Sequence, residues 1–252
     1  MLLALDMGNT DILIGLHDGN GWVQQWRNPS DQIDELRNRL INWMKEASYS
    51  FDWIDKSIFS TVVPAHRKKI SDLLRDLLQH EPIIMGPDFY PNFSIQIDNP
   101  SEIGSDLVAN AFCAYEKYGQ AAVVVDFGTA LSFTTISDRG EILGVSIAPG
   151  LRTAMRALFS KTAQLFEVPL EIPSSVIGKN TTHSLQAGIL RGYVGLVNEI
   201  LDQIEIELGK KPKVIATGGL VSILTPLHPR FDEIDQLHTI EGLRLIAEKY
   251  QG

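Results

Sequence analysis

The chain has 252 residues, of which 44% are hydrophobic and 21% charged, as is usual for a folded globular protein. Its formal net charge of −9 argues against a nucleic-acid surface, and its single cysteine, Cys113, excludes a disulfide framework. No apolar run approaches the length of a membrane span. From the charge and the run lengths together, we expect neither a nucleic acid nor a membrane as a partner.

The first residues predict a meander of three short strands, Leu2 to Leu5, Ile12 to Leu16 and Trp22 to Trp26. The first strand ends in the turn Asp6-Met7-Gly8-Asn9-Thr10. A glycine there lets backbone N–H groups approach an anion, while the threonine hydroxyl and the side-chain amide add donors. An aspartate cannot bind phosphate itself, but it can hold a hydrated cation that phosphates share. Because a strand starts so early, with no basic region before it, we expect no signal peptide and a cytoplasmic location.

Helices and strands alternate over the next part of the chain, which is an α/β order. Helical periodicity covers Ser30 to Ser48 and Ala65 to His80, and strands are expected at Ser57 to Val63 and Ile83 to Met85. The basic cluster of residues 66–69 opens the second helix, and we interpret it as a solvated helix face. The proline-containing segment 86–100 indicates a loop or a lobe boundary.

A further helix is predicted from Glu102 or Ser105 to Tyr118. Asp106 falls in its first turns, where the helix dipole favours an ionised carboxylate. The residues alone leave two interpretations open, an ordinary first-turn acid or a functional one. Cys113 lies among alanines and a phenylalanine, which predicts a buried structural thiol.

The stretch from Ala121 to Gly150 repeats the plan of the first meander. An apolar strand ends in Asp126-Phe127-Gly128-Thr129, and two further strands follow, Leu131 to Ile136 and Ile142 to Ile147. The two Asp-x-Gly turns, each closely followed by a threonine, lie 120 positions apart. Two unrelated hairpin turns would be the alternative, but the matching strand contexts favour a duplicated unit and two lobes.

The last hundred residues predict helices at Leu151 to about Leu165, Thr182 to Leu208 and Thr239 to Tyr250, and a strand at Lys213 to Ala216. Three glycines in the long helix allow close packing, either inside the chain or across a dimer; they are Gly188, Gly192 and Gly195. Thr217-Gly218-Gly219 is expected to open a helix N-terminus that could meet an anion. The six histidines have no zinc-ligand spacing, and neither a Walker loop nor a dinucleotide fingerprint is present.

These duplicated acidic turns and the late Gly-Gly turn resemble the sugar kinase, heat-shock ATPase and actin superfamily. Within it the chain is similar, nearly end to end, to type III pantothenate kinase. The segments that carry this resemblance are LALDMGNT (3–10), FSTVVP (59–64), NPSEIGSDLVANA (99–111), VVVDFGTALSF (123–133), IAPG (147–150), SVIGKNTTHSLQAGILRGYVGLV (175–197), VIATGGL (214–220) and HTIEGLRLI (238–246).

The resemblance implies two related lobes of the ribonuclease H-like/actin-like ATPase fold, each a mixed sheet with flanking helices, in an α/β protein. We place the lobes at residues 1–100 and 101–252, with the last helix able to pack back on the first lobe. The implied reaction is ATP-dependent phosphorylation of pantothenate to 4'-phosphopantothenate, the first step of coenzyme A biosynthesis. The family is a cytoplasmic homodimer that uses potassium or ammonium together with a divalent cation, expected to be magnesium.

Carried over position by position, the resemblance implies a role for each matching residue. Asp106 would accept the proton, and Asp126 would bind the monovalent cation. The ATP contacts would be Asp6, Met7, Gly8, Asn9, Thr10, Asp11 and Thr129. The pantothenate contacts would be Gly104, Ser105, Asp106, Leu107 and Thr181.

Two positions depart from the family pattern. Leu107 stands where the family usually has an arginine, and Ile97 where it has a substrate-contacting tyrosine. An arginine is the natural partner of a substrate carboxylate, and leucine cannot replace it. Arg152, or a group delivered across a dimer near Thr181, could supply the contact. Two alternatives therefore stay open, a regulatory nucleotide-binding homologue and a kinase of the same fold for another small hydroxyl compound.

Overall fold

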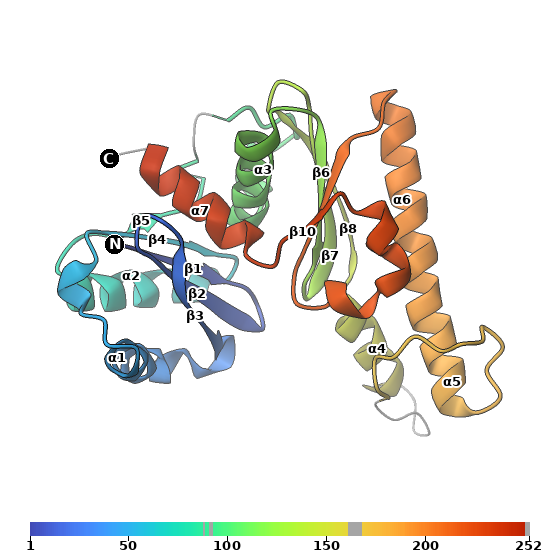
Figure 1. The fold of residues 1–252 in the computed structure, drawn as a ribbon, viewed down its shortest axis with the longest axis horizontal. Helices are drawn as coiled ribbons and strands as arrows, with labels where there is room; N and C mark the ends of the chain where they lie inside the picture. Colours follow the sequence, from blue (N-terminus) through green and yellow to red (C-terminus); the bar gives the residue numbers. More distant parts are fainter. Residues whose placement is uncertain (88, 91–92, 161–167, 250–252) are drawn as a thin grey trace. The chain divides into compact units, whose positions relative to one another are not determined.

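The computed structural model describes residues 1–87, 89–90, 93–160 and 168–249 (Figure 1). The chain divides into two compact units. Unit 1 comprises Met1–Lys117 together with His238–Gly252, and unit 2 comprises Tyr118–Leu237. This division falls 17 residues after the predicted lobe boundary at residue 100, because the helix that carries Asp106 has its contacts in unit 1.

Unit 1 contains a five-stranded sheet in the order β3-β2-β1-β4-β5. The first three strands form an antiparallel meander, and β4 and β5 continue the sheet in parallel. Their bounds are β1 Leu2–Met7, β2 Asp11–His17, β3 Trp22–Pro29, β4 Lys56–Thr61 and β5 Ile83–Ile84. Nearly all of β1 is buried, as expected for a central strand that is covered on both faces.

Unit 1 also contains α-helices, which bury apolar residues, and short 3-10 turns. They are the 3-10 turns η1 Ser30–Glu35, η2 Phe51–Trp53 and η3 Pro100–Glu102, and the α-helices α1 Leu36–Glu46, α2 Pro64–Leu78, α3 Ser105–Tyr118 and α7 His238–Lys249. The predicted single helix from Ser30 therefore begins as a 3-10 turn. The physical reason is that Ser30 is held by the turn after β1, since its amide donates to the Thr10 carbonyl oxygen (2.8 Å) and its hydroxyl to that of Gly8 (2.7 Å).

The C-terminal helix α7 joins unit 1 by close backbone packing. A Cβ atom placed on Gly242 would lie 2.1 Å from the carbonyl oxygen of Ala109 in α3, so only glycine allows this approach. The indole Nε1 of Trp22 donates to the Glu241 carboxylate at 2.9 Å. Cys113 is buried in α3, as predicted, with its Sγ atom 3.5 Å from Nδ1 of His238.

Unit 2 repeats the strand plan of unit 1, with the sheet order β10-β9-β6-β7-β8. An antiparallel meander, β6 Ala122–Phe127, β7 Ala130–Ile136 and β8 Ile142–Pro149, is extended in parallel by β9 Lys213–Thr217 and β10 Glu233–Ile234. Each strand of unit 2 has a counterpart in unit 1, and the counterparts follow in chain order, from β1 for β6 to β5 for β10. The structure confirms the α/β class and shows the same strand plan in both halves.

Helices flank the second sheet as well, and α6 lies alongside it in Figure 1. They are α4 Leu151–Ser160, α5 Thr181–Gln186, the π-helical turn η4 Ala187–Arg191, α6 Gly192–Leu208 and the 3-10 turns η5 Val221–Ile223 and η6 Thr225–Arg230. The predicted helix from Leu151 is described to residue 160, and its expected last turn lies outside the described residues. The predicted helix start at residues 217–219 is wrong, because a tight turn with Gly218 at φ +93° leads there into a 3-10 turn.

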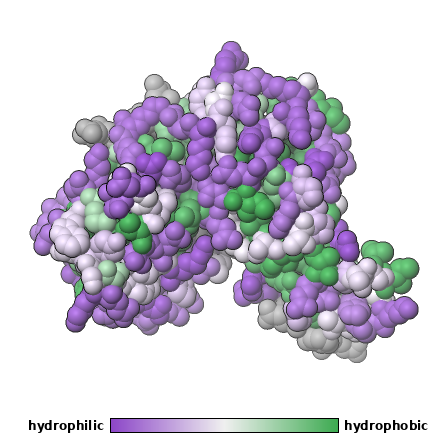
Figure 2. Space-filling view, in the orientation of Figure 1, coloured by the Kyte–Doolittle hydropathy of each residue, from purple (hydrophilic) through white to green (hydrophobic). Residues whose placement is uncertain are grey.

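The surface of unit 2 carries exposed large apolar side chains. Ile147, Val176, Ile177 and Ile206 are between 67% and 73% exposed. Figure 2 shows hydrophobic surface gathered in the region of α4 and α5. Within the described ranges, no helix combines the length and the apolar character needed to cross a membrane.

Candidate active site

The acidic turn of unit 1 is fixed at both of its ends. The amide of Gly8 donates to the Asp11 carbonyl oxygen at 3.0 Å, which closes the turn. Ser30 also binds the turn, through its hydrogen bonds to the carbonyl oxygens of Thr10 and Gly8. Asp6 is the penultimate residue of β1 and accepts a 2.5 Å hydrogen bond from the hydroxyl of Ser60 on β4, its partner in the parallel register. Asn9, Thr10 and Asp11 are exposed. A rigid turn thus presents exposed polar groups beside a positioned carboxylate.

The acidic turn of unit 2 has the same construction. Asp126 is the penultimate residue of β6 and lies opposite Thr217 of the parallel strand β9, as Asp6 lies opposite Ser60. The amide of Gly128 donates to the Ala130 carbonyl oxygen at 3.0 Å. Thr129 is exposed at the tip of the turn.

Two glycines allow the backbone to pack tightly under the second turn. A Cβ atom on Gly150 would lie 2.3 Å from the carbonyl oxygen of Gly128, and one on Gly218 would lie 2.7 Å from the backbone of Phe127. The Thr129 carbonyl oxygen also accepts from the Gly150 amide (3.0 Å) and the Thr153 hydroxyl (2.8 Å). Gly150 and Thr153 therefore both hold the backbone of Thr129.

Asp106 lies in the first turn of α3, as predicted. One of its carboxylate oxygens accepts from the amide of Leu107 at 2.9 Å. Burial raises the pKa of the Asp106 carboxyl above its ordinary value of 3.8, although this amide hydrogen bond opposes the rise. Gly104 makes room for the group, because a Cβ atom there would lie 2.3 Å from Oδ1 of Asp106. A desolvated carboxyl at a helix N-terminus, with a pKa moved toward neutrality, is suited to accept a proton.

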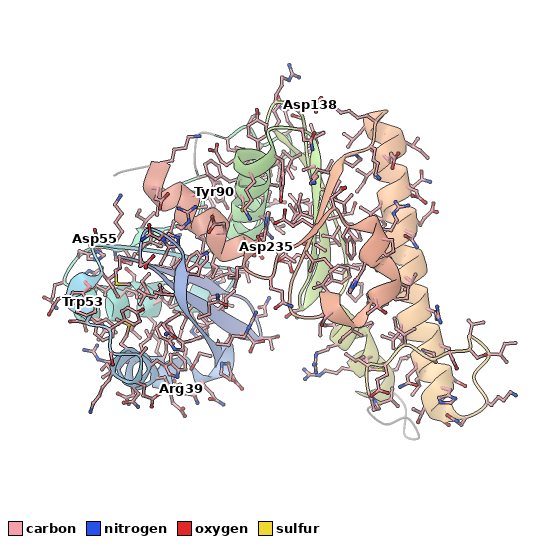
Figure 3. All side chains as sticks on the ribbon, viewed as in Figure 1. Arg39, Trp53, Asp55, Tyr90, Asp138 and Asp235 are labelled. Carbon is pink, nitrogen blue, oxygen red and sulfur yellow. The ribbon has the colours of Figure 1, made fainter. Side chains whose placement is uncertain are left out.

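Tyr90 approaches the residues just before α3 from the loop after β5 (Figure 3). Its hydroxyl donates to the carbonyl oxygen of Ile103 at 2.8 Å. Burial raises the pKa of this phenol, the Asp106 carboxylate raises it further, and the Arg67 guanidinium lowers it. The sequence analysis named neither residue as a site candidate. Arg67 belongs to the basic cluster at 66–69, which was interpreted as a solvated helix face, and no local pattern pointed to Tyr90.

The remaining predicted substrate positions differ in their surroundings. Ser105 and Leu107 are buried in α3, whereas Ile97 is half-buried in the loop before it. Thr181 is the exposed first residue of α5 in unit 2, after the N-cap Asn180, whose side chain accepts from the His183 amide at 2.9 Å. Arg152 is exposed in the first turn of α4, also in unit 2.

The oxygen groups around Asp126 are of the kind that hard cations prefer. Its carboxylate stands in register with the hydroxyl-bearing Ser132 on one side and Thr217 on the other. Over the described residues, no cluster of three or more His, Cys, Asp or Glu side chains could hold a metal ion by itself. The single carboxylates of the two turns therefore fit cations whose remaining ligands come from phosphate or water.

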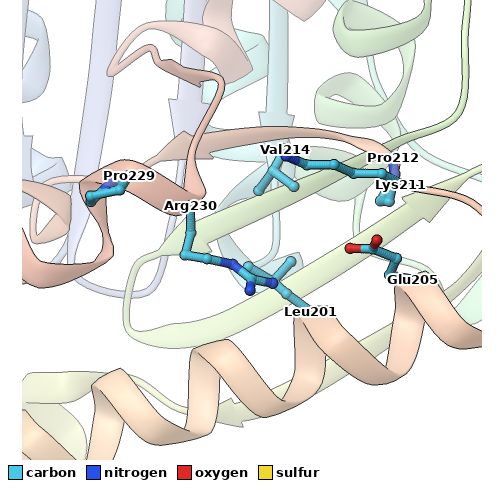
Figure 4. Close-up of a pocket in the computed structure, with 7 residues that line it drawn as sticks. All are labelled: Leu201, Glu205, Lys211, Pro212, Val214, Pro229 and Arg230. Carbon is cyan, nitrogen blue, oxygen red and sulfur yellow. The ribbon is translucent and has the colours of Figure 1, made fainter.

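A separate surface pocket of about 190 Å³ lies in unit 2 between α6 and the start of β9 (Figure 4). Its lining includes Glu205, Lys211 and Arg230, and Arg230 also pairs with Asp202 at 2.7 Å. Since Lys213 is in register with Ala122, at the opposite end of β6 from Asp126, this pocket lies at the other end of the sheet. It is no part of the candidate active site.

Comparisons with known proteins agree with this geometry. Residues 2–203 match the family model described as type III pantothenate kinase. The type III pantothenate kinase of Citrifermentans bemidjiense is 40% identical over 252 residues and covers 99% of each chain. That of Geotalea daltonii is 39% identical and covers 99% of this chain and 98% of its own.

Solved structures show the same fold at low identity. A Campylobacter jejuni protein described as a Baf family transcriptional activator has a TM-score of 0.64 at 19% identity and covers 98% of each chain. The activator of the 2-hydroxyisocaproyl-CoA dehydratase from Clostridium difficile, solved with bound ADPNP, has a TM-score of 0.54 at 12% identity and covers 100% of this chain and 98% of its own. With both the family model and relatives at about 40% identity spanning the sequence, the chain belongs to the type III pantothenate kinase family.

Proposed function

We propose that this kinase transfers the γ-phosphoryl group of ATP to the primary hydroxyl of pantothenate, giving 4'-phosphopantothenate for coenzyme A biosynthesis. The observation that carries the proposal is the half-buried Asp106 at the start of α3, whose carboxyl pKa is raised by desolvation, in a chain that matches the family over its length. A role in the cytoplasm fits a biosynthetic kinase whose one cysteine is a buried thiol.

In this proposal Asp106 is the proton acceptor. Burial makes its carboxylate a stronger base than an exposed aspartate, because the ionised form is less well solvated. The group takes the proton of the substrate hydroxyl as the oxygen attacks the γ-phosphorus, the bond to the ADP oxygen breaks, and ADP leaves. The transfer is direct, so no covalent enzyme intermediate forms.

The two acidic turns are proposed to bind the nucleotide. In this proposal the exposed side chains of Asn9, Thr10 and Thr129 donate to phosphate oxygens. Asp126 would hold potassium or ammonium, and the turn that begins at Asp6 would serve the magnesium–ATP complex. When bound, these cations offset the charge on the phosphates.

A direct test of the cation assignment is Asp126→Ala. We expect the variant to keep its fold, since the Asp126 side chain is only half-buried next to the turn that follows β6, and to lose its activation by potassium over sodium. The measurement is ATP turnover in matched potassium and sodium buffers, with thermal unfolding as the control for folding. Unchanged potassium activation would exclude Asp126 as a ligand.

We also propose that the protein is a homodimer through the face of α6 and the π-helical turn before it. Gly188, Gly192 and Gly195 lie on this face, all three are exposed, and a Cβ atom added to any of them meets nothing within 4 Å. An internal contact would have filled that space, so the open face favours a second copy of the chain. Light scattering after size exclusion should give twice the 28.0 kDa chain mass.

The departures at Leu107 and Ile97 favour one alternative, a homologue that binds nucleotide but has lost catalysis. One assay separates the possibilities: ATP consumption measured with and without pantothenate, in potassium and in sodium. Pantothenate-dependent ADP formation supports the kinase. ATP binding without turnover would support the regulatory homologue, and turnover only with a different hydroxyl compound would identify another substrate.

A further inference from the structure

Pantothenate places two demands on a binding site at opposite ends of one molecule. Its primary hydroxyl must reach the proton acceptor, and its carboxylate needs a positive charge or several donors. Between these ends lie as many chain atoms as in three residues of backbone, about 10 Å when extended. A group that binds the carboxylate therefore belongs about that far from Asp106.

The helix that carries Asp106 does not supply this charge. Leu107, the next residue, is a buried apolar side chain, and the cation of α3, Lys117, lies in its last turn. A 14-residue helix is about 20 Å long, so Lys117 is too far along α3 to serve a substrate held at its first turn. The charge must come from a neighbouring element.

Arg67 is the cation that the fold of unit 1 brings to this region. It lies in the first turn of α2 and is half-buried, unlike the exposed Lys68 beside it. Its guanidinium packs on the backbone of Gly86, since a Cβ atom there would lie 3.5 Å from both terminal nitrogens. Gly86 starts the turn that leads to Tyr90, because the amide of Phe89 donates to the Gly86 carbonyl oxygen at 2.8 Å.

Tyr90 connects this arginine to the start of α3. The Tyr90 hydroxyl is 2.8 Å from the carbonyl oxygen of Ile103, three residues before Asp106. Both the Asp106 carboxylate and the Arg67 guanidinium lie near enough to act on the phenol electrostatically, in opposite directions. Proton acceptor, phenol and guanidinium thus share one region of unit 1, with the phenol within electrostatic range of both charges.

We propose that Arg67 binds the carboxylate of the phosphoryl acceptor, with Tyr90 lining the path between that carboxylate and Asp106. The inference rests on the proposed function, because it takes pantothenate as the acceptor. An arginine suits the task, since its planar fork can bind a carboxylate through two hydrogen bonds. The position also accounts for Leu107, since recognition of the carboxylate from α2 leaves that position free to pack as an apolar residue.

The test compares pantothenate with pantothenyl alcohol, which keeps the reacting hydroxyl and replaces the carboxylate by an uncharged group. For wild type, kcat/KM should favour the acid. Arg67→Gln should raise KM for pantothenate by about ten- to hundredfold, the usual cost of a lost charge-assisted contact, and leave KM for the alcohol unchanged. Arg67→Lys should recover part of the preference. Lys68→Gln, which removes a neighbouring exposed charge, is the matched control and should behave as wild type.

Each outcome is decisive because folding and ATP affinity are measured for every variant. If Arg67→Gln still prefers the acid as strongly as wild type, Arg67 does not bind the carboxylate. If wild type phosphorylates acid and alcohol equally well, the carboxylate is not recognised and this inference fails while the proposed function stands. If wild type phosphorylates neither, the proposed function itself fails. Equal losses for both compounds in Arg67→Gln would show a general structural role and would also overturn the inference.

Discussion

Asp106 combines burial with a helix N-terminus, and this combination determines what its substitution should do. Asp106→Asn keeps the size of the side chain but cannot accept the proton. Turnover with pantothenate should fall by about 10² to 10⁴, the usual contribution of a general base, while ATP affinity changes little. Steady-state kinetics with calorimetric titration of ATP would measure both. A variant with near wild-type turnover would contradict the assignment of Asp106.

The same substitution, which should lower turnover, should raise the stability of the protein at neutral pH. Because burial raises the pKa of Asp106 above 3.8, folding favours the protonated group and disfavours the ionised one. The wild-type protein therefore loses stability as pH rises through the raised pKa, whereas Asp106→Asn does not. The free energy of unfolding of the variant should exceed that of wild type at pH 7, and the excess should disappear below pH 3.8. Urea unfolding across this range is the measurement, and a pH-independent difference would refute the raised pKa.

Gly104 should be needed for the position of the Asp106 carboxylate more than for stability. A methyl group there would lie 2.3 Å from Oδ1, the end of a side chain that can rotate away. Gly104→Ala is therefore expected to lower kcat at least tenfold, since small misplacements of a reacting group are costly, and to change Tm little. Gly21→Ala, where an added methyl group meets nothing within 4 Å, is the matched control in unit 1. Equal kinetics for the two variants would show that Gly104 does not position Asp106.

Some site residues could be predicted from the sequence because their signal is local. The acidic turns and Asp106 lie within short segments whose pattern carries the chemistry. Arg67 and Tyr90 could not be found in this way, since they lie 39 and 16 positions before Asp106 in the chain. Only the packing of α2, the turn at Gly86 and the start of α3 brings them into one region. Ser30 was predicted as the start of a helix, and its hydroxyl instead bonds the turn after β1.

At the scale of elements, periodicity predicted the sheet strands better than the irregular turns. The meanders in both units lie where the short apolar runs predicted strands, with differences of a few residues at the strand ends. The π-helical turn at Ala187–Arg191 could not be predicted, because its residues keep the helical apolar pattern. The short strand Glu233–Ile234 was missed for another reason, since it begins with a charged residue and lacks the apolar run that marked Ile83 to Met85.

The contact between α7 and α3 gives a test at this scale. In Gly242→Ala the new methyl group would lie 2.1 Å from a backbone oxygen that cannot rotate away, so the two helices must separate. Overpacking of this kind costs about 1 to 3 kcal/mol of the free energy of unfolding. Urea titration would detect the loss, and Gly21→Ala, where an added methyl group meets nothing within 4 Å, should show none. Equal stability of both variants would mean that α7 does not pack on α3 as closely as the structure shows.

For the whole molecule, the duplicated turns correctly indicated two related sheets. The expectation also allowed the last helix to pack back on the first lobe, and the structure places that helix in unit 1. The chain returns to unit 1 at His238 because α7 packs on β1, β4 and α3, a tertiary contact that no local pattern encodes. Likewise α3 follows the proline-containing loop in the chain, yet its residues through Lys117 belong to unit 1. The unit that contains Asp106 is therefore built from both ends of the protein.

The most direct test of the proposed function is the identity of the phosphorylated product. Purified protein would be incubated with ATP, magnesium, potassium and pantothenate, and the mixture followed by phosphorus and proton NMR. We predict one new phosphomonoester on the primary hydroxyl of pantothenate, formed in equal amount with ADP, and no product with Asp106→Asn on the same time scale. ADP accompanied only by inorganic phosphate, or no ADP at all, would contradict the assignment of this protein as a pantothenate kinase.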